Sequence, residues 1–327
     1  MTTQKELIEA TELEKLKKYL SSKPRIIILA HAGPDGDTVG ATLALHETFS
    51  NAGVDVKVAC IDPIPTNLQF VPFTDRMQND FNEDDFDAVF FVDCGARKMT
   101  KFQEYKERIL SDKMVKLNLD HHPTNDKWGE INFVASHAAS STQIVFELLQ
   151  KLEFKITPKI ATCLLLGIYT DTGSFMHQNT TPSVYKAAAE LMKLGANFSL
   201  IAKNVFRSND FKVLKLWGKV LQNLYVTSDG AAIVGVNKKD YESLGAKRED
   251  LAGVIDYINS MPEAKYSVLL SEDEKGNVKA SLRTRKPDVD VKALAEKFGG
   301  GGHVKASGFT IKDSRLEKEI KWKIVEK

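Results

Sequence analysis

The sequence predicts two α/β domains: an N-terminal domain with a mostly parallel sheet flanked by helices and, after a helical connector, a smaller C-terminal domain with a mixed sheet. Three observations lead to this prediction. Short runs of β-branched and aromatic residues alternate with helical stretches up to residue 120, which is the pattern of a parallel sheet. Residues 142–223 are mostly helical in pattern. After them, strand-like runs are separated by turn sequences such as Ser-Asp-Gly.

Each expected element follows from a local pattern. Apolar residues recur at helical spacing over residues 4–20, and the apolar run at 25–30 (RIIILA) is typical of a strand buried on both faces. The other N-terminal elements are a helix at 38–51 and strands at 54–60, 88–93 and 115–120. In the C-terminal part we expect strands at 225–236, 266–271 and 277–283, a helix at 290–297 and an apolar segment at 306–311. The resulting domains are 1–195 and 216–327, joined by a helical linker at 196–215.

Composition and charge argue against several classes of protein. The 327 residues include 45 Lys and Arg and 44 Asp and Glu, a balance that disfavours binding of long nucleic acid through a basic surface. The three cysteines are isolated, so neither a disulfide framework nor a structural zinc site is expected. The N-terminus is polar, and no apolar run reaches the ~20 residues that span a bilayer. We therefore expect a cytoplasmic protein that has no membrane segment.

Histidine and aspartate residues stand at the carboxyl ends of three expected strands. The segment His31-Ala32-Gly33-Pro34-Asp35-Gly36-Asp37 follows the first strand, Asp93 ends the third, and Asp120-His121-His122 ends the fourth. In open parallel sheets, ligands bind at this edge. Carboxylates and imidazoles on a closely wrapping backbone are typical ligands of a divalent cation. Taken alone, the first segment is equally typical of a solvated Pro-Asp-Gly turn, and Asp93 of a strand-end turn.

The two adjacent histidines have different expected roles. Neighbouring residues of an extended segment point in opposite directions, so one histidine is expected to bind metal while the other faces a substrate. Asp120 is expected to hold a ring N–H and so fix the tautomer of a histidine. The alternative for this segment is a surface loop.

Three further segments carry polar groups or glycines in unusual places. Asp171 follows a buried helical run and precedes Gly173, so it is either a metal ligand or part of a helix terminus. Four glycines and His303 stand at 299–303, where backbone N–H groups can approach an anion closely; a flexible linker is the alternative. Residues 139–142 precede a helix, either as an ordinary cap or as a phosphate site at its N-terminus.

In this order, the motifs resemble those of the DHH phosphoesterases that carry a C-terminal DHHA1 domain. The series is H-x-x-x-D-x-D at 31–37, V-D-C-G at 92–95, D-H-H at 120–122, Asp171 after a helix, and the glycines with His303. The resemblance runs from about residue 24 to residue 310. It is strongest to the stand-alone NrnA-like branch of bifunctional oligoribonucleases (nanoRNases) and pAp phosphatases.

This resemblance implies a role for each matching residue. It implies two divalent metal ions, held by His31, Asp35, Asp37, Asp93, His121 and Asp171, with Asp93 bridging both. His122 would contact the scissile phosphate, so that His122 and Asp93 are the expected catalytic residues. The implied substrate-binding residues are Arg283, Arg285, Gly300, Gly301, Gly302 and His303. Because the ligands mix nitrogen and oxygen, Mn²⁺ is the expected ion, with Mg²⁺ and Co²⁺ as alternatives.

The implied activity is hydrolysis of short oligoribonucleotides (nanoRNA, pApA) and of 3′-phosphoadenosine 5′-phosphate (pAp) by attack of metal-activated water. The expected partners are therefore short RNA or a dinucleotide and pAp, with a homodimer as an open expectation and no long nucleic acid. A cyclic di-AMP phosphodiesterase would use the same site.

Three other functions are disfavoured. A RecJ-like exonuclease on single-stranded DNA would require more chain length and a basic surface. A pyrophosphatase of the DHH type would carry a different motif in place of the glycines and His303. A nucleotide-binding regulator with a degenerate site would have lost ligand residues, and every expected ligand position is filled.

Overall fold

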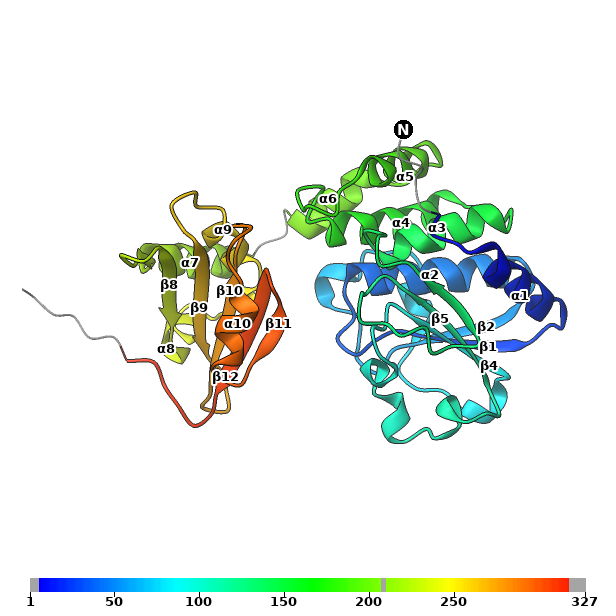
Figure 1. Cartoon of the computed structure of the whole chain (residues 1–327), viewed down its shortest axis with the longest axis horizontal. Coiled ribbons are helices and arrows are strands. Elements are labelled where there is room, and N and C mark those ends of the chain that lie inside the picture. Colours follow the sequence, from blue (N-terminus) through cyan, green and yellow to red (C-terminus); the bar gives the residue numbers. More distant parts are fainter. Residues whose placement is uncertain (1–5, 207–209, 318–327) are drawn as a thin grey trace, which may run out of the picture. The chain divides into compact units, whose positions relative to one another are not determined.

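The computed structural model describes residues 6–206 and 210–317, and the chain divides into two compact units, Met1–Ser208 and Asn209–Lys327 (Figure 1). Each unit has its own sheet and its own apolar clusters. The segment predicted as a linker, 196–215, contains helix α6 (Phe198–Phe206) and the start of α7 (Phe211–Gln222). The domain limits 1–195 and 216–327 stay predictions.

Six parallel strands form the sheet of the first unit, in the order β3-β2-β1-β4-β5-β6. Every pairing in it is parallel, which confirms the predicted sheet. Strands β3 and β6 are not expected from the sequence, because they are short strands at the two edges. The strands are β1 (Arg25–Leu29), β2 (Asp55–Ala59), β3 (Met77–Gln78), β4 (Ala88–Val92), β5 (Val115–Asp120) and β6 (Ile131–Val134).

Helices cover one face of this sheet, and the segment 81–114, with its short 3₁₀ helices, covers the other. Ile26 and Ile28 of β1 pack with α-helical residues, whereas Ile27 and Leu29 pack with segment 81–114. All four side chains are fully buried, which confirms a strand enclosed on both faces. Figure 1 shows α2, α3 and α4 on one side of the strands. The helices are α1 (Ala10–Ser21), α2 (Gly36–Asn51), α3 (Ser141–Lys151), α4 (Pro158–Asp171) and α5 (Pro182–Lys193), with η1 (Thr66–Leu68), η2 (Thr74–Arg76), η3 (Glu83–Asp85), η4 (Arg97–Thr100), η5 (Phe102–Glu104) and η6 (Arg108–Leu110).

The N-terminal helix is shorter than the sequence predicts. Helix α1 begins at Ala10 rather than at residue 4, and residues 4 and 5 lie outside the described residues. Ile8 is fully buried in the core of the first unit. The following residue, Glu9, has an extended backbone and occupies the N-cap position of α1. Burial of Ile8 therefore sets the path of the chain before the helix starts.

The second unit contains a mixed sheet in the order β11-β12-β10-β9-β8-β7, as predicted. Strands β8 and β9 pair in parallel, and the other neighbours are antiparallel. The expected strand at 225–236 is a hairpin whose turn contains Ser-Asp-Gly. The strands are β7 (Tyr225–Val226), β8 (Ala231–Val236), β9 (Tyr266–Glu272), β10 (Val278–Arg283), β11 (Gly301–His303) and β12 (Ala306–Ile311).

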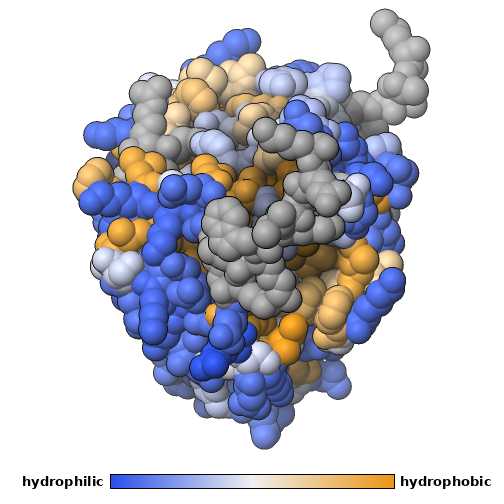
Figure 2. Space-filling view, turned by 90° about the vertical axis from the view of Figure 1, so that its left-hand side faces the viewer, coloured by the Kyte–Doolittle hydropathy of each residue, from blue (hydrophilic) through white to orange (hydrophobic). Residues whose placement is uncertain are grey.

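Apolar clusters lie on both faces of this second sheet. One contains Leu216 of α7, Val234 of β8 and Ile258, and the other contains Leu282 of β10 and Val291. The remaining helices are α8 (Lys238–Glu242), η7 (Arg248–Leu251), α9 (Val254–Ile258) and α10 (Val291–Glu296). Figure 2 shows one face of the molecule, where orange hydrophobic areas alternate with blue hydrophilic areas. Within the described residues, none of the helices combines the length and the apolar character required to cross a membrane.

Candidate metal centre

Three neighbouring strands carry the predicted ligands to one edge of the first sheet. His31 follows β1, Asp93 follows β4 directly, and His121 follows β5 directly. Because β1, β4 and β5 are parallel neighbours, their carboxyl ends meet at the same edge. The order also reverses here: the chain continues from β1 to β2 on one side and from β4 to β5 on the other. Ligands of open α/β sheets bind in the crevice at such a reversal.

Asp93 lies at the middle of the cluster and is 2% exposed. Its backbone is left-handed (φ 60°), a conformation that aspartate adopts more readily than most residues. One carboxylate oxygen accepts a hydrogen bond from Oγ of Ser141 at 2.9 Å, and the other accepts one from Oγ1 of Thr38 at 2.5 Å. Nε2 atoms of His31 and His121 each lie 3.7 Å from an Asp93 oxygen.

The first motif forms the start of helix α2. Asp35 caps this helix, and one of its oxygens accepts hydrogen bonds from the N–H groups of Asp37 and Thr38, both at 3.0 Å. The cap turns the chain so that Asp37 points into the protein, where it is fully buried. An aspartate as buried as this requires hydrogen-bond donors or a cation nearby.

The donors to Asp37 come from the start of helix α3. The N–H groups of Ser141 and Thr142 donate to its two oxygens at 2.6 and 2.9 Å, and Oγ1 of Thr142 adds a bond at 2.6 Å. Ser140 caps the same helix by accepting from N–H of Gln143. The N-terminus of α3 therefore binds the carboxylate of Asp37, where the sequence suggests a phosphate as one alternative. The positive end of the helix dipole stabilises this negative charge.

Close packing of two helices brings Asp37 and Asp171 together. A Cβ atom on Gly40 of α2 would overlap the backbone oxygen of Cys163 in α4. A Cβ atom on Gly167 of α4 would overlap both Oδ1 of Asp37 and Oγ1 of Thr142. These glycines therefore permit α2 and α4 to approach at the level of the site. Asp171 is the last residue of α4, and its Oδ2 lies 3.2 Å from Nε2 of His121.

His121 and His122 face the same side of the chain, contrary to the expectation. Their ring centroids are 4.6 Å apart, and both rings approach Oδ1 of Asp93, at 3.7 and 3.9 Å. The alternation of a strand does not apply, because β5 ends at Asp120 and the chain turns after it. The predicted contact of Asp120 is present: its Oδ1 accepts a hydrogen bond from Nδ1 of His122 at 2.7 Å.

Burial and neighbouring charges shift the pKa values of several of these groups. Desolvation, then Asp93 as the next largest cause, raises the pKa of Asp37 well above its usual range. Desolvation and the charges of Asp37, Asp93 and Asp35 raise the pKa of Asp171 to about 10. Desolvation lowers the pKa of His121, whereas the hydrogen bond that His122 donates to Asp120 raises the pKa of His122 to about 9.

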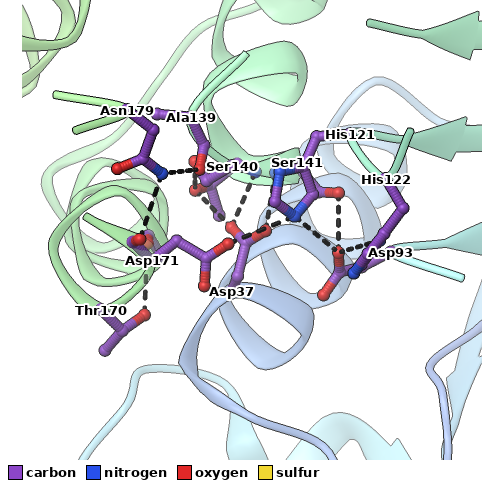
Figure 3. A network of polar contacts seen from close by, with 12 residues as sticks. Asp37, Asp93, His121, His122, Ala139, Ser140, Ser141, Thr170, Asp171 and Asn179 are labelled. Atoms are coloured by element: carbon purple, nitrogen blue, oxygen red, sulfur yellow. Dashed lines mark hydrogen bonds and ion pairs between the residues drawn. The ribbon is translucent and has the colours of Figure 1, made fainter. Parts of the chain in front are cut away.

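Seven histidine and aspartate side chains form three overlapping groups of metal-ligand type, and Figure 3 shows the five of them that come from Asp37, Asp93, His121, His122 and Asp171. In each group, one ligand atom per residue lies within 4.8 Å of the others. Asp93 belongs to two of the groups, and His121 also belongs to two, so the groups form one continuous cluster. The structure therefore brings all six predicted ligands together. The groups are Asp93, His121 and His122; His31, Asp35 and Asp93; and Asp37, His121 and Asp171.

The contacts of Thr38 show that a cation fits this cluster. Nδ1 of His31 lies 2.9 Å from the backbone oxygen of Ala32 and donates to it, so Nε2 of the neutral ring carries a lone pair. Oγ1 of Thr38 lies 2.5 Å from that Nε2 and 2.5 Å from Oδ2 of Asp93. When the ring is neutral, the single hydroxyl hydrogen of Thr38 cannot satisfy both acceptors. One acceptor then lacks a proton, and a divalent cation can take the place of that proton.

The predicted substrate-binding residues lie in the second unit. Arg283 of β10 and His303 of β11 both pair with Ala306 of β12, so they occupy one row across three neighbouring strands. Nε of Arg283 also lies 3.9 Å from Oδ1 of Asp256. Arg285 is exposed and lies beyond the end of β10.

Two of the glycines at 299–302 are required by the close packing of neighbouring strands. Residues 301–303 form the edge strand β11 rather than a linker. A Cβ atom on Gly300 would overlap the backbone oxygen of Gly308, and one on Gly302 would come 2.7 Å from that of Ala306. A Cβ atom on Gly301 would meet no atom within 4 Å. Close strand packing therefore explains Gly300 and Gly302, whereas Gly301 leaves open space above the sheet.

Several residues that build the centre are not predicted from the sequence as site residues. They are Thr38, the hydroxyl donors Ser141 and Thr142, and the two helix glycines, Gly40 and Gly167. The hydroxyl residues at 139–142 can be recognised in the sequence as possible donors, but the sequence does not indicate that they donate to Asp37 and Asp93. Glycines inside helices 36–51 and 158–171 would have been a second signal, since glycine weakens a helix unless close packing requires it.

Two family models match the chain. The model of the DHH family N-terminal domain matches residues 25–168, and that of the DHHA1 domain matches residues 231–326. The first covers the strands that carry His31, Asp93 and His121, and the second covers strands β8 to β12 of the second unit.

The chain is also similar to proteins of known name. It is 32% identical to the bifunctional oligoribonuclease and PAP phosphatase NrnA of Thermus thermophilus, over 89% of this chain and 86% of that protein. It is 27% identical to NrnA of Bacillus subtilis, over 90% of this chain and 92% of that protein. An exopolyphosphatase-related protein from Bacteroides fragilis has the same fold, with a TM-score of 0.85, 24% identity, and coverage of 94% of this chain and 92% of that one.

Proposed function

This chain belongs to the DHH/DHHA1 family, and we propose that it is a metal-dependent hydrolase acting on short oligoribonucleotides such as pApA and on pAp. The observation that carries the proposal is the convergence of His31, Asp93, His121 and Asp171 with two further aspartates at one sheet edge. The NrnA relatives, named for oligoribonuclease and PAP phosphatase activity, support the choice of substrates.

The proposed ligands of two divalent cations are His31, Asp35, Asp37, Asp93, His121 and Asp171. Asp93 is the proposed bridging ligand, because it belongs to two of the three overlapping groups. When bound, such cations supply Lewis-acid chemistry: they make water a stronger nucleophile and neutralise phosphoryl oxygens. The ligand set mixes imidazole nitrogen with carboxylate oxygen, which favours Mn²⁺, with Mg²⁺ and Co²⁺ as alternatives.

His122 is proposed to bind the reacting phosphate rather than a cation. Its Nδ1 donates to Asp120, which leaves Nε2 free to donate outward. Because the pKa of His122 is raised to about 9, the ring is a cation at neutral pH. A cationic donor stabilises the charge that develops on phosphoryl oxygens, or gives a proton to the leaving oxygen.

Arg283, Arg285, His303 and the glycines 300–302 are proposed to bind the part of the substrate away from the reacting phosphate. The common row of Arg283 and His303, and the open space above Gly301, support this role. A guanidinium and an imidazole in one row, on the two strands that flank β12, are well suited to a terminal phosphate.

The test is a substrate panel on the Mn²⁺-loaded protein: pApA, pAp, a short RNA, cyclic di-AMP and a long single-stranded DNA. Release of AMP from pApA and of phosphate from pAp is expected. Faster cleavage of cyclic di-AMP than of pApA would favour the cyclic dinucleotide phosphodiesterase, and processive cleavage of long DNA would favour a RecJ-like exonuclease. If pApA, pAp and short RNA all stay intact, the proposal is wrong.

A cytoplasmic location is part of the proposal. Cys60, Cys94 and Cys163 are buried and unpaired, as expected in a reducing compartment. Burial raises the pKa of all three thiols, so they are poor nucleophiles. The homodimer stays a prediction, which sedimentation velocity would test.

A further inference from the structure

We infer that Asn179 is a positioning residue for the metal centre, because its amide ties the end of the helix that presents Asp171 to the segment whose N–H groups hold Asp37. The inference rests on the proposed function, since it concerns the same ligands. Nδ2 of Asn179 donates to the backbone oxygen of Ala139 at 3.1 Å and to that of Asp171 at 3.2 Å. The amide has two hydrogens, and each has its own acceptor.

Both ends of this bridge lie next to ligands. Asp171 is the last residue of α4, so its backbone oxygen has no partner within the helix. Ala139 precedes the residues at the start of α3 that donate to Asp37 and Asp93. Figure 3 shows Asn179 beside the backbone of Asp171, whose carboxylate points toward His121. Asn179 therefore connects the end of one ligand-bearing helix to the support of two other ligands.

The loop between Asp171 and Asn179 holds the amide in place. Gly173, Ser174 and Phe175 are all left-handed, with φ of 53°, 63° and 65°. Such a conformation in two non-glycine residues requires support from the surroundings. N–H of Ser174 donates to the backbone oxygen of Tyr169 at 2.8 Å.

Aromatic contacts fix the same loop. The ring of Phe175 stacks on Tyr185 with centroids 5.5 Å apart, and it packs edge-on against Tyr169 at 5.7 Å. The loop therefore returns Asn179 to Asp171 along a defined path. Nδ1 of His177 also lies 3.3 Å from the backbone oxygen of Asp171, but this contact involves only the end of α4 and does not connect it to Ala139. The bridge between the two segments is made by Asn179.

Loss of the bridge would let Asp171 move relative to Asp37 and His121, whose ligand atoms lie within 4.8 Å of one another. Partners that orient ligands typically change metal affinity by 10–100-fold when they are removed. Asn179 itself is exposed, so its replacement opens no cavity in the core. A positioning role therefore predicts weaker metal binding at nearly unchanged stability.

The test is calorimetric titration of the metal-free protein with Mn²⁺, comparing wild type with Asn179→Ala and Asn179→Leu. The leucine keeps the volume of the side chain and removes both donors. Gln178→Ala, at the exposed neighbouring position, is the matched control. We expect the weaker of two Mn²⁺ sites to lose about tenfold in affinity in both Asn179 variants. Turnover should fall at limiting Mn²⁺ and recover at saturating Mn²⁺, whereas the control should match wild type.

Affinities within twofold of wild type in both variants would overturn the inference. So would a Tm of the metal-free variants that falls by more than about 5 °C, because Asn179 would then support the fold rather than the ligands. A wild-type protein that binds no Mn²⁺ would instead contradict the proposed metal centre. The two failures are therefore distinguishable.

Discussion

Oδ1 of Asp120 accepts a hydrogen bond from Nδ1 of His122 at 2.7 Å, in a carboxylate that is fully buried. The other oxygen of Asp120 accepts from Nδ2 of Asn125 at 2.8 Å, and the N–H of His121 donates to Oδ1 at 2.9 Å. Asp120 thus has a fixed position, and it fixes the ring of His122 in turn. The raised pKa of His122 therefore depends first on the hydrogen bond to a fully buried carboxylate.

Asp120→Asn should therefore lower the pKa of His122 from about 9 toward the ordinary value, because the raised pKa comes first from the hydrogen bond to Asp120. The cationic ring would be lost at a lower pH, and the alkaline limb of the kcat/KM profile should shift to lower pH. We expect kcat to fall about 10–100-fold. NMR titration of His122 and a pH–rate profile measure the effect, with exposed Asp126→Asn as control. An unchanged pH–rate profile in Asp120→Asn would show that the reaction does not depend on the charge of His122.

Asp93→Asn should abolish most of the turnover, by about 10³-fold or more, since one change weakens the ligand proposed to bridge both cations. The stoichiometry of bound Mn²⁺ should also fall below two per chain. Asp112→Asn, at an exposed position outside the cluster, is the control. Turnover near the wild-type rate in Asp93→Asn would contradict the bridging role.

Mn²⁺ binding should be coupled to proton release. The raised pKa of about 10 means that Asp171 holds a proton at neutral pH in the absence of cations. A cation must displace this proton, so the apparent affinity for Mn²⁺ should rise with pH between about 6 and 9. Calorimetry in buffers of different ionisation enthalpy counts the protons released. An affinity independent of pH would show that Asp171 is already ionised.

Asp171→Asn should stabilise the metal-free protein while it weakens Mn²⁺ binding. The folded-state pKa of Asp171 lies above its unfolded value of 3.8, so stability from this group is present at low pH and is lost as pH rises toward 10. Asparagine cannot ionise. The Tm difference in favour of the variant should therefore widen from pH 5 to pH 9, reaching about 2 °C or more. Differential scanning calorimetry with EDTA tests this, and a variant Tm below wild type at pH 9 would contradict it.

Gly301→Ala should raise KM for pApA and leave Mn²⁺ binding and Tm unchanged, because its methyl group would enter open space above β11. Gly218→Ala on α7 is the control, because Gly218 is exposed and a Cβ atom there would also meet no atom within 4 Å. By contrast, Gly302→Ala should lower Tm, since Gly302 is left-handed (φ 135°) and closely faces β12. A wild-type KM in Gly301→Ala would remove this glycine from the substrate site.

Local pattern was sufficient for most elements of the chain. The run at 26–29 is buried on both faces, and Val115–Asp120 forms a strand with the predicted bounds. Edge strands such as β3 and β6 are too short to leave a pattern. The start of α1 depends on burial of Ile8, which only the folded core provides.

The orientation of His121 and His122 could not be predicted from the local sequence pattern. Alternation along a strand predicts opposite directions, but β5 ends one residue earlier and both rings approach Asp93. The donors to Asp37 come from a helix more than one hundred residues later in the chain. Residues so far apart in the sequence form no local pattern from which their contact could be predicted.

By itself, the sequence determined which side chains stand at the ends of the strands, because strand ends and turns are local properties of the chain. It therefore determined that His31, Asp93 and His121 would reach one edge of a parallel sheet. Only the tertiary structure decided how these groups are held: Asp37 by the start of α3, and Asp171 by the close approach of α2 and α4 at Gly40 and Gly167. The physical reason is that burying a carboxylate requires donors from several segments at once, and only folding brings those segments together.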